Sequence, residues 1–279
     1  MKKISRRSFL AAAGLSVAAL ALTACGGSSS SVASSVASSA ASSEAASTSA
    51  AAGELTTVEA GKLTMATNAT FPPYEMTTDA GDIEGIDVET AQAIADKLGL
   101  ELQIDDMDFD AALLSVQQGK ADIVMAGVTV TDERKAVMDF SDSYATGIQS
   151  IIVPEGSDIA SPDDLAGKKI GTQRGTTGYI YCSDDFGDDA VVAYDDGLTA
   201  VQALNNGQVD AVVIDNAPAK EFVAANPGLV ILDTSYAEED YAIGMAKGSS
   251  LEDAVNAALE ELKADGTLQS IVDKYITAE

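Results

Sequence analysis

The sequence contains no histidine and no tryptophan among its 279 residues, and only two cysteines, Cys25 and Cys182. Without histidine the chain has no Ser-His-Asp or Cys-His catalytic group and no histidine-ligated metal site. Two cysteines are too few for a disulfide framework or a cysteine-rich metal site. We therefore expect no catalytic residues, no cofactor and no metal, and we interpret Cys182 as a lone thiol in an acidic loop.

Positively charged residues are also scarce, because 16 Lys and Arg stand against 44 Asp and Glu, for a formal net charge of −28. A surface this acidic repels phosphate groups. We therefore expect neither nucleic acid nor anionic lipid headgroups as partners.

Long hydrophobic runs are limited to the N-terminus. Basic residues between Lys2 and Arg7 precede an apolar, Ala-rich run over residues 9–24, which is short for a bilayer span. This pattern predicts an export signal peptide over residues 1–24. The sequence SRRSFL at residues 5–10 resembles a twin-arginine motif, but an ordinary basic signal region explains it equally, so the export route stays open.

The signal ends in LTAC at residues 22–25, which resembles a lipobox, in which a peptidase cuts before a cysteine that receives a diacylglyceryl group. We predict that Cys25 is lipidated and anchors the protein to the outer face of the cell membrane. The following residues are almost wholly Ser and Ala and offer little to bury. We interpret residues 25–53 as the lipidated cysteine and a flexible tether.

From Glu54 onward the chain is long enough for one large domain or two small lobes. The first elements are a strand, a helix with one apolar face and a second strand, over residues 62–67, 85–99 and 100–104. Strand and helix continue to alternate up to two C-terminal helices over residues 251–264 and 268–275. This alternation predicts an α/β fold.

The stretch AGVTVTDERKAVMDFSD at residues 126–142 follows a short apolar run, residues 122–125, that is typical of a buried strand. Helix-forming residues extend from 132 to 140. Thr131 stands where a helix N-cap belongs. The stretch therefore predicts a loop and a helix start directly after a buried strand.

Three residues of this stretch carry chemistry suited to a small anion. Gly127 allows a ligand to approach the backbone closely, Thr129 offers a hydroxyl, and Arg134 offers a bidentate guanidinium. Together with amide groups at a helix start, they predict a carboxylate receptor.

A weak internal repeat links this region to a later one. Residues 112–124 (ALLSVQQGKADIV) and 200–212 (AVQALNNGQVDAV) share Ala, Gly, Asp and Val at the same spacing, offset by 88. Each copy is predicted to be a helix ended by Gly, a turn and a buried strand. The repeat indicates two similar lobes.

Adding the offset of 88 to Gly127 gives Asp215, at the end of the equivalent strand. Open α/β sheets bind ligands at the carboxyl ends of their strands. If the lobes face each other, Arg134 and Asp215 oppose across a cleft. A zwitterion with a carboxylate and an ammonium group fits between them, which describes a free α-amino acid.

Six short motifs are specific in combination: FPPYE (71–75), GIDVE (85–89), AGVTVTDER (126–134), DFSD (139–142), RGTTG (174–178) and DAVVID (210–215). With them the chain, over about residues 55–276, resembles the polar amino-acid family of extracellular solute-binding proteins of ABC importers. That group contains the glutamine- and histidine-binding proteins.

The resemblance implies a two-lobed, type II periplasmic-binding-protein-like fold. Each lobe is expected to be a doubly wound sheet, and two crossing hinge strands, near residues 145–149 and 240–244, to join the lobes. We expect lobe 1 to comprise residues 54–146 plus 243–279 and lobe 2 to comprise residues 147–242.

The resemblance also implies roles for individual residues. Arg134, Thr129 and the Gly127 backbone would hold the ligand carboxylate, with Thr177 supplementing them from the second lobe. Asp215 would receive the α-ammonium group.

The ligand side chain would lie between Phe71 and Phe109 as an aromatic sandwich. Asn68 stands where an acidic residue often contacts the ligand's side chain in this family, and Gln173 where a Lys can sit. Because neither supplies a formal charge, a neutral polar ligand such as glutamine is favoured over lysine, arginine or glutamate. Two nearby acids that offer a replacement charge are Asp106 and Asp110.

These features predict a lipid-anchored, extracytoplasmic and monomeric binding protein that delivers an amino acid to an ABC permease by hinge closure. One alternative is an enzyme, because this fold has dehydratase relatives that act on cyclohexadienyl acids. A second alternative is a sensory module that reports its ligand to a membrane receptor.

Overall fold

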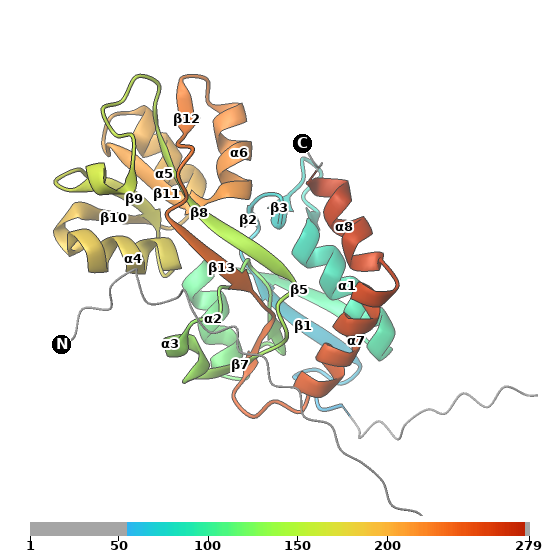
Figure 1. Cartoon of the computed structure of the whole chain (residues 1–279). Coiled ribbons are helices and arrows are strands. Elements are labelled where there is room, and N and C mark those ends of the chain that lie inside the picture. Colours follow the sequence, from blue (N-terminus) through green and yellow to red (C-terminus); the bar gives the residue numbers. More distant parts are fainter. Residues whose placement is uncertain (1–54, 277–279) are drawn as a thin grey trace, which may run out of the picture. The chain divides into compact units, whose positions relative to one another are not determined.

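The computed structural model describes residues 55–276, in which helices and strands alternate (Figure 1). The predicted signal peptide (1–24), lipidated Cys25 and tether (to residue 53) lie outside the described residues. The strands are β1 (Lys62–Thr67), β2 (Thr70–Phe71), β3 (Glu75–Thr77), β4 (Ile83–Glu84), β5 (Glu101–Asp106), β6 (Ile123–Val124), β7 (Met138–Phe140), β8 (Ala145–Pro154), β9 (Ile170–Gln173), β10 (Val191–Tyr194), β11 (Ala211–Asp215), β12 (Leu229–Ile231), β13 (Ala237–Tyr241) and β14 (Gly244–Ala246). The helices are α1 (Ile86–Leu98), α2 (Phe109–Gln117), α3 (Asp132–Lys135), α4 (Thr177–Phe186), α5 (Gly197–Asn205), α6 (Asn216–Ala225), α7 (Glu252–Ala264) and α8 (Thr267–Tyr275), with 3-10 turns at Pro162–Leu165 and Asp188–Ala190.

Two mixed sheets form the centres of two lobes. Their strand orders are β5-β1-β6-β14-β7 and β10-β9-β11-β8-β12, and a small sheet, β2-β3-β4, accompanies the first. In both large sheets three parallel strands are followed by an antiparallel one, which is β14 in the first and β8 in the second. The two lobes therefore share one topology, as the internal repeat predicts.

Alternating side chains along the central strands face two separate hydrophobic clusters. In the first sheet Leu63 and Met65 pack with α1, α7 and α8, whereas Ala66 packs with α2. In the second sheet Val212 packs with α5 and α6, whereas Val213 packs with the α4 side. Because successive strand residues point to opposite faces, each sheet is covered on both faces, and the doubly wound prediction is confirmed.

The repeated segments have the same local structure. Helices α2 and α5 start and end at positions that differ by 88, and Asp108 and Asp196 are their N-cap residues. Each helix is followed by a glycine with positive φ, Gly119 at 65° and Gly207 at 67°. Glycine adopts this conformation without steric cost, so in both copies of the repeat the chain turns back directly into a buried strand.

The hinge consists of β8 and β13, which pair antiparallel and run between the two sheets (Figure 1). Gly147 of β8 faces Tyr241 of β13 so closely that a Cβ atom at Gly147 would lie 2.4 Å from the tyrosine ring. The second crossing was expected at residues 240–244 but lies over Ala237–Tyr241, because residue 244 already begins β14 of the first sheet. The exact lobe boundaries stay a prediction.

Two expectations from local sequence are wrong. The helix expected over residues 132–140 ends at Lys135, because residues Met138–Phe140 pair with β14 as strand β7 and bury Met138. Tertiary pairing thus overrides helix propensity there. Cys182 does not lie in a loop, because it is buried within α4 against the core of the second lobe.

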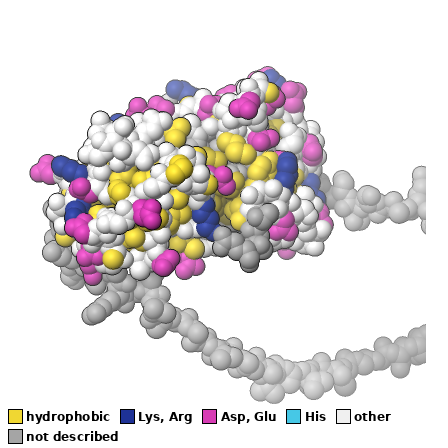
Figure 2. Space-filling view, turned by 90° about the horizontal axis from the view of Figure 1, so that it is seen from above, with side chains coloured by type: hydrophobic (Ala, Val, Ile, Leu, Met, Phe, Trp, Pro, Cys, Tyr) yellow, Lys and Arg dark blue, Asp and Glu magenta, His cyan; other side chains and the backbone are white. Residues whose placement is uncertain are grey.

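The surface agrees with the acidic composition, since Asp and Glu side chains are spread over the face shown in Figure 2, between hydrophobic patches. Within residues 55–276 no helix combines the length and the apolar character needed to cross a membrane.

Candidate functional site

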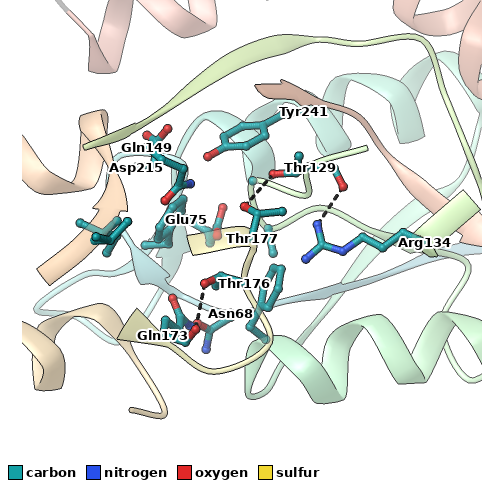
Figure 3. Close-up of a pocket in the computed structure, with 16 residues that line it drawn as sticks. Asn68, Glu75, Thr129, Arg134, Gln149, Gln173, Thr176, Thr177, Asp215 and Tyr241 are labelled. Atoms are coloured by element: carbon teal, nitrogen blue, oxygen red, sulfur yellow. Dashed lines mark hydrogen bonds between the residues drawn. The ribbon is translucent and has the colours of Figure 1, made fainter. Parts of the chain in front are cut away.

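One cavity lies where β1, β6, β9 and β11 end, between the two sheets and beside the hinge strands (Figure 3). Its volume is about 20 Å³. The structure brings all nine sequence-predicted site residues into its lining: Asn68, Phe71, Phe109, Gly127, Thr129, Arg134, Gln173, Thr177 and Asp215. Seven further lining residues are Glu75, Ala126, Gln149, Thr176, Val213, Ile214 and Tyr241.

Arg134 lies at one end of the cavity and is only 8% exposed. Its Nη1 donates to the Thr129 carbonyl oxygen at 2.8 Å and its Nη2 to the Gly175 carbonyl oxygen at 3.1 Å. The guanidinium also lies 5.5 Å from the centre of the Phe109 ring. Burial lowers the pKa of Arg134, but a guanidinium stays charged in proteins. Because these hydrogen bonds go to carbonyl groups, they orient the positive charge without neutralising it.

Two hydroxyl groups lie beside this charge. The Thr129 hydroxyl donates to Glu239 Oε2 at 3.0 Å and lies 3.5 Å from the Thr177 hydroxyl. Thr177 is 2% exposed and is the first residue of α4, whose N-cap is Thr176. A helix start favours negative charge, so this part of the cavity suits a carboxylate.

The contribution of Gly127 differs from the expectation. Its N–H donates to Asp87 Oδ2 at 2.9 Å, so that amide is already used within the protein. A Cβ at this position would lie 2.9 Å from the Phe71 ring, and φ is +55°. Gly127 therefore provides space and a left-handed turn. The predicted helix start also provides little, because α3 is a single turn and the Arg134 N–H donates to the Thr131 hydroxyl.

Asp215 lies at the opposite end of the cavity from Arg134 (Figure 3). It ends β11 and is the N-cap of α6, with Oδ1 accepting from the Ala217 N–H at 3.0 Å. Its Oδ2 accepts from the Ile148 N–H at 2.7 Å. Burial raises the pKa of Asp215 to about 6 despite these hydrogen bonds. At neutral pH the carboxylate is thus ionised in a buried place, where a ligand cation would stabilise it.

Asn68 directly follows β1, Gln173 is the last residue of the equivalent strand β9, and the two meet across the cavity. Gln173 Nε2 donates to Asn68 Oδ1 at 2.8 Å. Phe71 and Phe109 are both buried in the lining.

Besides Asp215, the acid that lines the cavity is Glu75, and not Asp106 or Asp110, which were the two acids proposed from the sequence. Asp106 instead accepts a hydrogen bond from the Ala69 N–H at 2.8 Å. Glu75 stands in the FPPYE motif, so the sequence contained a signal for it. Gln149 and Tyr241 lie on the hinge strands, and no local pattern links them to the cavity.

Contacts between the lobes close the cavity. They are the Gln173–Asn68 and Arg134–Gly175 hydrogen bonds and the approach of Thr129 to Thr177. A volume of about 20 Å³ holds roughly one water molecule. An amino acid therefore requires the lobes to separate before it enters.

The model of the bacterial extracellular solute-binding proteins, family 3, matches residues 63–278. The chain belongs to this family. It is 34% identical to the L-cystine-binding protein TcyJ of Escherichia coli (strain K12) over an alignment of 226 residues, with coverage of 79% of this chain and 85% of the relative.

Two solved structures of this kind are similar to more than three quarters of the chain. One is an ancestral arginine-binding protein bound to arginine, with a TM-score of 0.74, 43% identity and coverage of 77% of this chain and 98% of that one. The other is an ancestral arginine-binding protein bound to glutamine, with a TM-score of 0.75, 42% identity and coverage of 78% and 99%. These relatives of the solute-binding protein are binding proteins and not enzymes, so the dehydratase alternative is not favoured.

Proposed function

We propose that this solute-binding protein is the amino-acid receptor of an ABC importer. In this proposal Cys25 carries a lipid that holds the monomeric protein at the outer face of the cell membrane, where it delivers a free polar L-amino acid to a permease. The observation that carries the proposal is one buried cavity with Arg134 and Asp215 at its opposite ends. The ligands in the names of the relatives, which include cystine and arginine, support this ligand class.

In the proposed complex the ligand carboxylate pairs with Arg134 and accepts hydrogen bonds from the hydroxyls of Thr129 and Thr177. The Thr129 hydroxyl would turn to the ligand from Glu239, to which it now donates. Asp215 accepts the α-ammonium group. Because the two ligand ends contact different lobes, the ligand stabilises the closed form over the open form, and the permease recognises that closed form.

The side chain of the ligand would extend past Phe71 and Phe109 towards Asn68 and Gln173. These two amides favour a polar side chain. Arginine and glutamine are the first ligands to test, because ancestral relatives bind both.

Calorimetry with a panel of amino acids tests the function, and Arg134→Ala tests the site. Removing one partner of a desolvated charge pair costs about 2–5 kcal/mol, which is roughly thirty-fold to several-thousand-fold in affinity. We expect this loss for every amino acid, because Arg134 contacts the group that all of them share. Asp215→Asn should weaken amino acids but spare analogues that lack the ammonium group.

Thermal melting without ligand shows whether each variant is folded, and the ligand-induced rise in melting temperature should vanish. Binding of an amino acid to Arg134→Ala within threefold of wild type would contradict the proposed site.

A further inference from the structure

Glu75 is a carboxyl group of the cavity to which the described residues offer no hydrogen-bond donor. It is fully buried at the start of β3, and neither of its oxygens accepts a hydrogen bond from an N–H or hydroxyl group of residues 55–276. Figure 3 shows it among the residues that line the cavity. A buried ionised carboxylate without donors is strongly unfavourable. This side chain therefore requires either a proton or a positively charged partner.

Asp87 of α1 is the second carboxyl group of this region and is also fully buried. Its Oδ2 accepts from the Gly127 N–H at 2.9 Å and from the Tyr144 hydroxyl at 2.8 Å. Its Oδ1 accepts from no such donor in the described part of the chain. Two donors at one carboxylate mark Asp87 as the ionised member of the pair.

The two residues are neighbours, because the Asp87 N–H donates to the carbonyl oxygen of Tyr74, which precedes Glu75, at 2.9 Å, and, besides burial, the charge of Asp87 raises the pKa of Glu75. Two buried carboxyl groups this near each other are stable together only if one of them carries a proton. Burial, followed by repulsion from Asp87, raises the pKa of Glu75 well above its ordinary value. For Asp87 burial also raises the pKa, to about 6, and the Gly127 and Tyr144 donors oppose this. Because two donors hold Asp87 and none holds Glu75, the proton of the pair belongs to Glu75.

The groups around Glu75 supply negative charge or neutral hydroxyls rather than a cation. The charged groups that act on it are Asp87 from α1 and Asp106 from β5. Two tyrosines also lie near Glu75, since its charge contributes to raising the pKa of its neighbour Tyr74 and of Tyr144, which precedes β8. Arg134 donates to carbonyl oxygens at the carboxylate end of the cavity. A cation that reaches Glu75 would thus come from a ligand.

We propose that Glu75 and Asp87 share one proton in the ligand-free protein and that this proton makes the choice between cationic and neutral ligand side chains depend on pH. This inference rests on the proposed function. A ligand guanidinium near Glu75 replaces the proton: the Glu75 O–H bond breaks, the proton leaves to solvent, and the carboxylate pairs with the guanidinium. A neutral carboxamide leaves the proton in place. One proton is therefore released for each arginine bound and none for each glutamine.

Calorimetry of the purified full chain with L-arginine, L-glutamine and L-citrulline from pH 5.5 to 8.5 tests this exchange. Citrulline has nearly the shape of arginine without its charge. The ratio of arginine to citrulline affinity should rise with pH, by up to tenfold per pH unit, because one proton is released. Using the ratio cancels the titration of Asp215, which contacts a group that the three ligands share. Repeating the titrations in two buffers of different ionisation enthalpy counts the protons directly.

Two variants show whether the pH dependence comes from the Glu75–Asp87 pair or from other groups. Glu75→Gln keeps the shape but has no proton to release, so the affinity ratio should become independent of pH and arginine should weaken at least tenfold. The matched control is Asp110→Asn, an exposed acid outside the lining, which should keep the pH dependence of wild type. If Glu75→Gln does not fold, the proton count for arginine against citrulline in wild type decides alone.

Equal proton release for arginine and citrulline, or an affinity ratio that is constant from pH 5.5 to 8.5, would overturn the inference and leave the proposed function intact. Failure of arginine to bind at any pH while another amino acid binds would also overturn it. If no amino acid in the panel binds, the proposed function itself fails.

Discussion

At the scale of single residues, several residues of the cavity have two roles. Asp215 caps α6 and also lines the cavity, so one carboxylate stabilises a helix start and is available to a ligand. Gly127 turns the chain, leaves room for Phe71 and donates its N–H to Asp87. Such residues tie the shape of the cavity to the stability of the fold.

The titration of Asp215 gives a prediction with a defined sign. Its pKa is about 6 in the folded protein and 3.8 when unperturbed, so the folded state binds this proton more tightly than the unfolded chain does. Ionised Asp215 therefore lowers the free energy of unfolding at neutral pH, by about 3 kcal/mol for a shift of this size. Wild type should gain most of this amount relative to Asp215→Asn as the pH falls from 7 to 4. Denaturant unfolding of both proteins at several pH values measures the difference, and a constant difference would contradict the prediction.

At the scale of elements, the repeat places equivalent aspartates in unequal surroundings. Asp122 accepts hydrogen bonds from the N–H groups of Val58 at 2.7 Å and Thr64 at 2.8 Å and is 6% exposed. Asp210, 88 positions later, accepts one from the Lys169 N–H at 2.7 Å and is exposed. The same turn thus connects helix to strand in both lobes, with different burial.

Substituting the two aspartates by alanine uses each as the control of the other. Asp122→Ala leaves the buried Thr64 N–H without an acceptor, whereas the N–H of the exposed Val58 can bond to water, so the free energy of unfolding should fall by about 1–3 kcal/mol. Asp210→Ala exposes its single N–H to water and should cost under about 1 kcal/mol. Urea unfolding of both variants measures these values. An equal loss in both would show that burial does not set the cost.

At the scale of the whole molecule, two lobes of one topology meet at a cavity and are joined by β8 and β13 (Figure 1). The lobes contact each other through the residues that also line the cavity, such as Asn68 and Gln173. Ligand entry and lobe separation are therefore one event. Tyr241, packed on Gly147, connects the hinge to the cavity wall.

The anchor is also a property of the whole molecule. Replacing Cys25 by Ala removes the thiol that the lipobox interpretation requires, so the protein should appear in the medium or keep its signal peptide. Membrane fractionation and intact-mass measurement of the mature protein distinguish these outcomes. If Cys25→Ala stays in the membrane, is trimmed normally and has lost no lipid mass, Cys25 is not the anchor.

The sequence by itself determined the repeated strand and helix elements and the choice of Arg134 and Asp215 as the two charged residues of the site. Strand β1 lies at the predicted residues 62–67, and the spacing of 88 relates α2 to α5 and Gly127 to Asp215. These features depend on local propensity, periodic burial and strand ends, all of which a single segment contains. Arg134 and Asp215 could be paired because they come after equivalent strands of two similar lobes, and open α/β sheets bind ligands at the carboxyl ends of their strands.

Only the tertiary structure decided what depends on contacts between distant segments. Residues Met138–Phe140 became a strand because β14, about 106 positions later, pairs with them. The Gly127 N–H donates to Asp87, 40 positions earlier, and, besides burial, the charge of the same Asp87 raises the pKa of Glu75. Glu75, Gln149 and Tyr241 face the cavity because two lobes and a hinge surround it. No local sequence pattern predicts that these three residues are neighbours, because only the packing of distant segments brings them together.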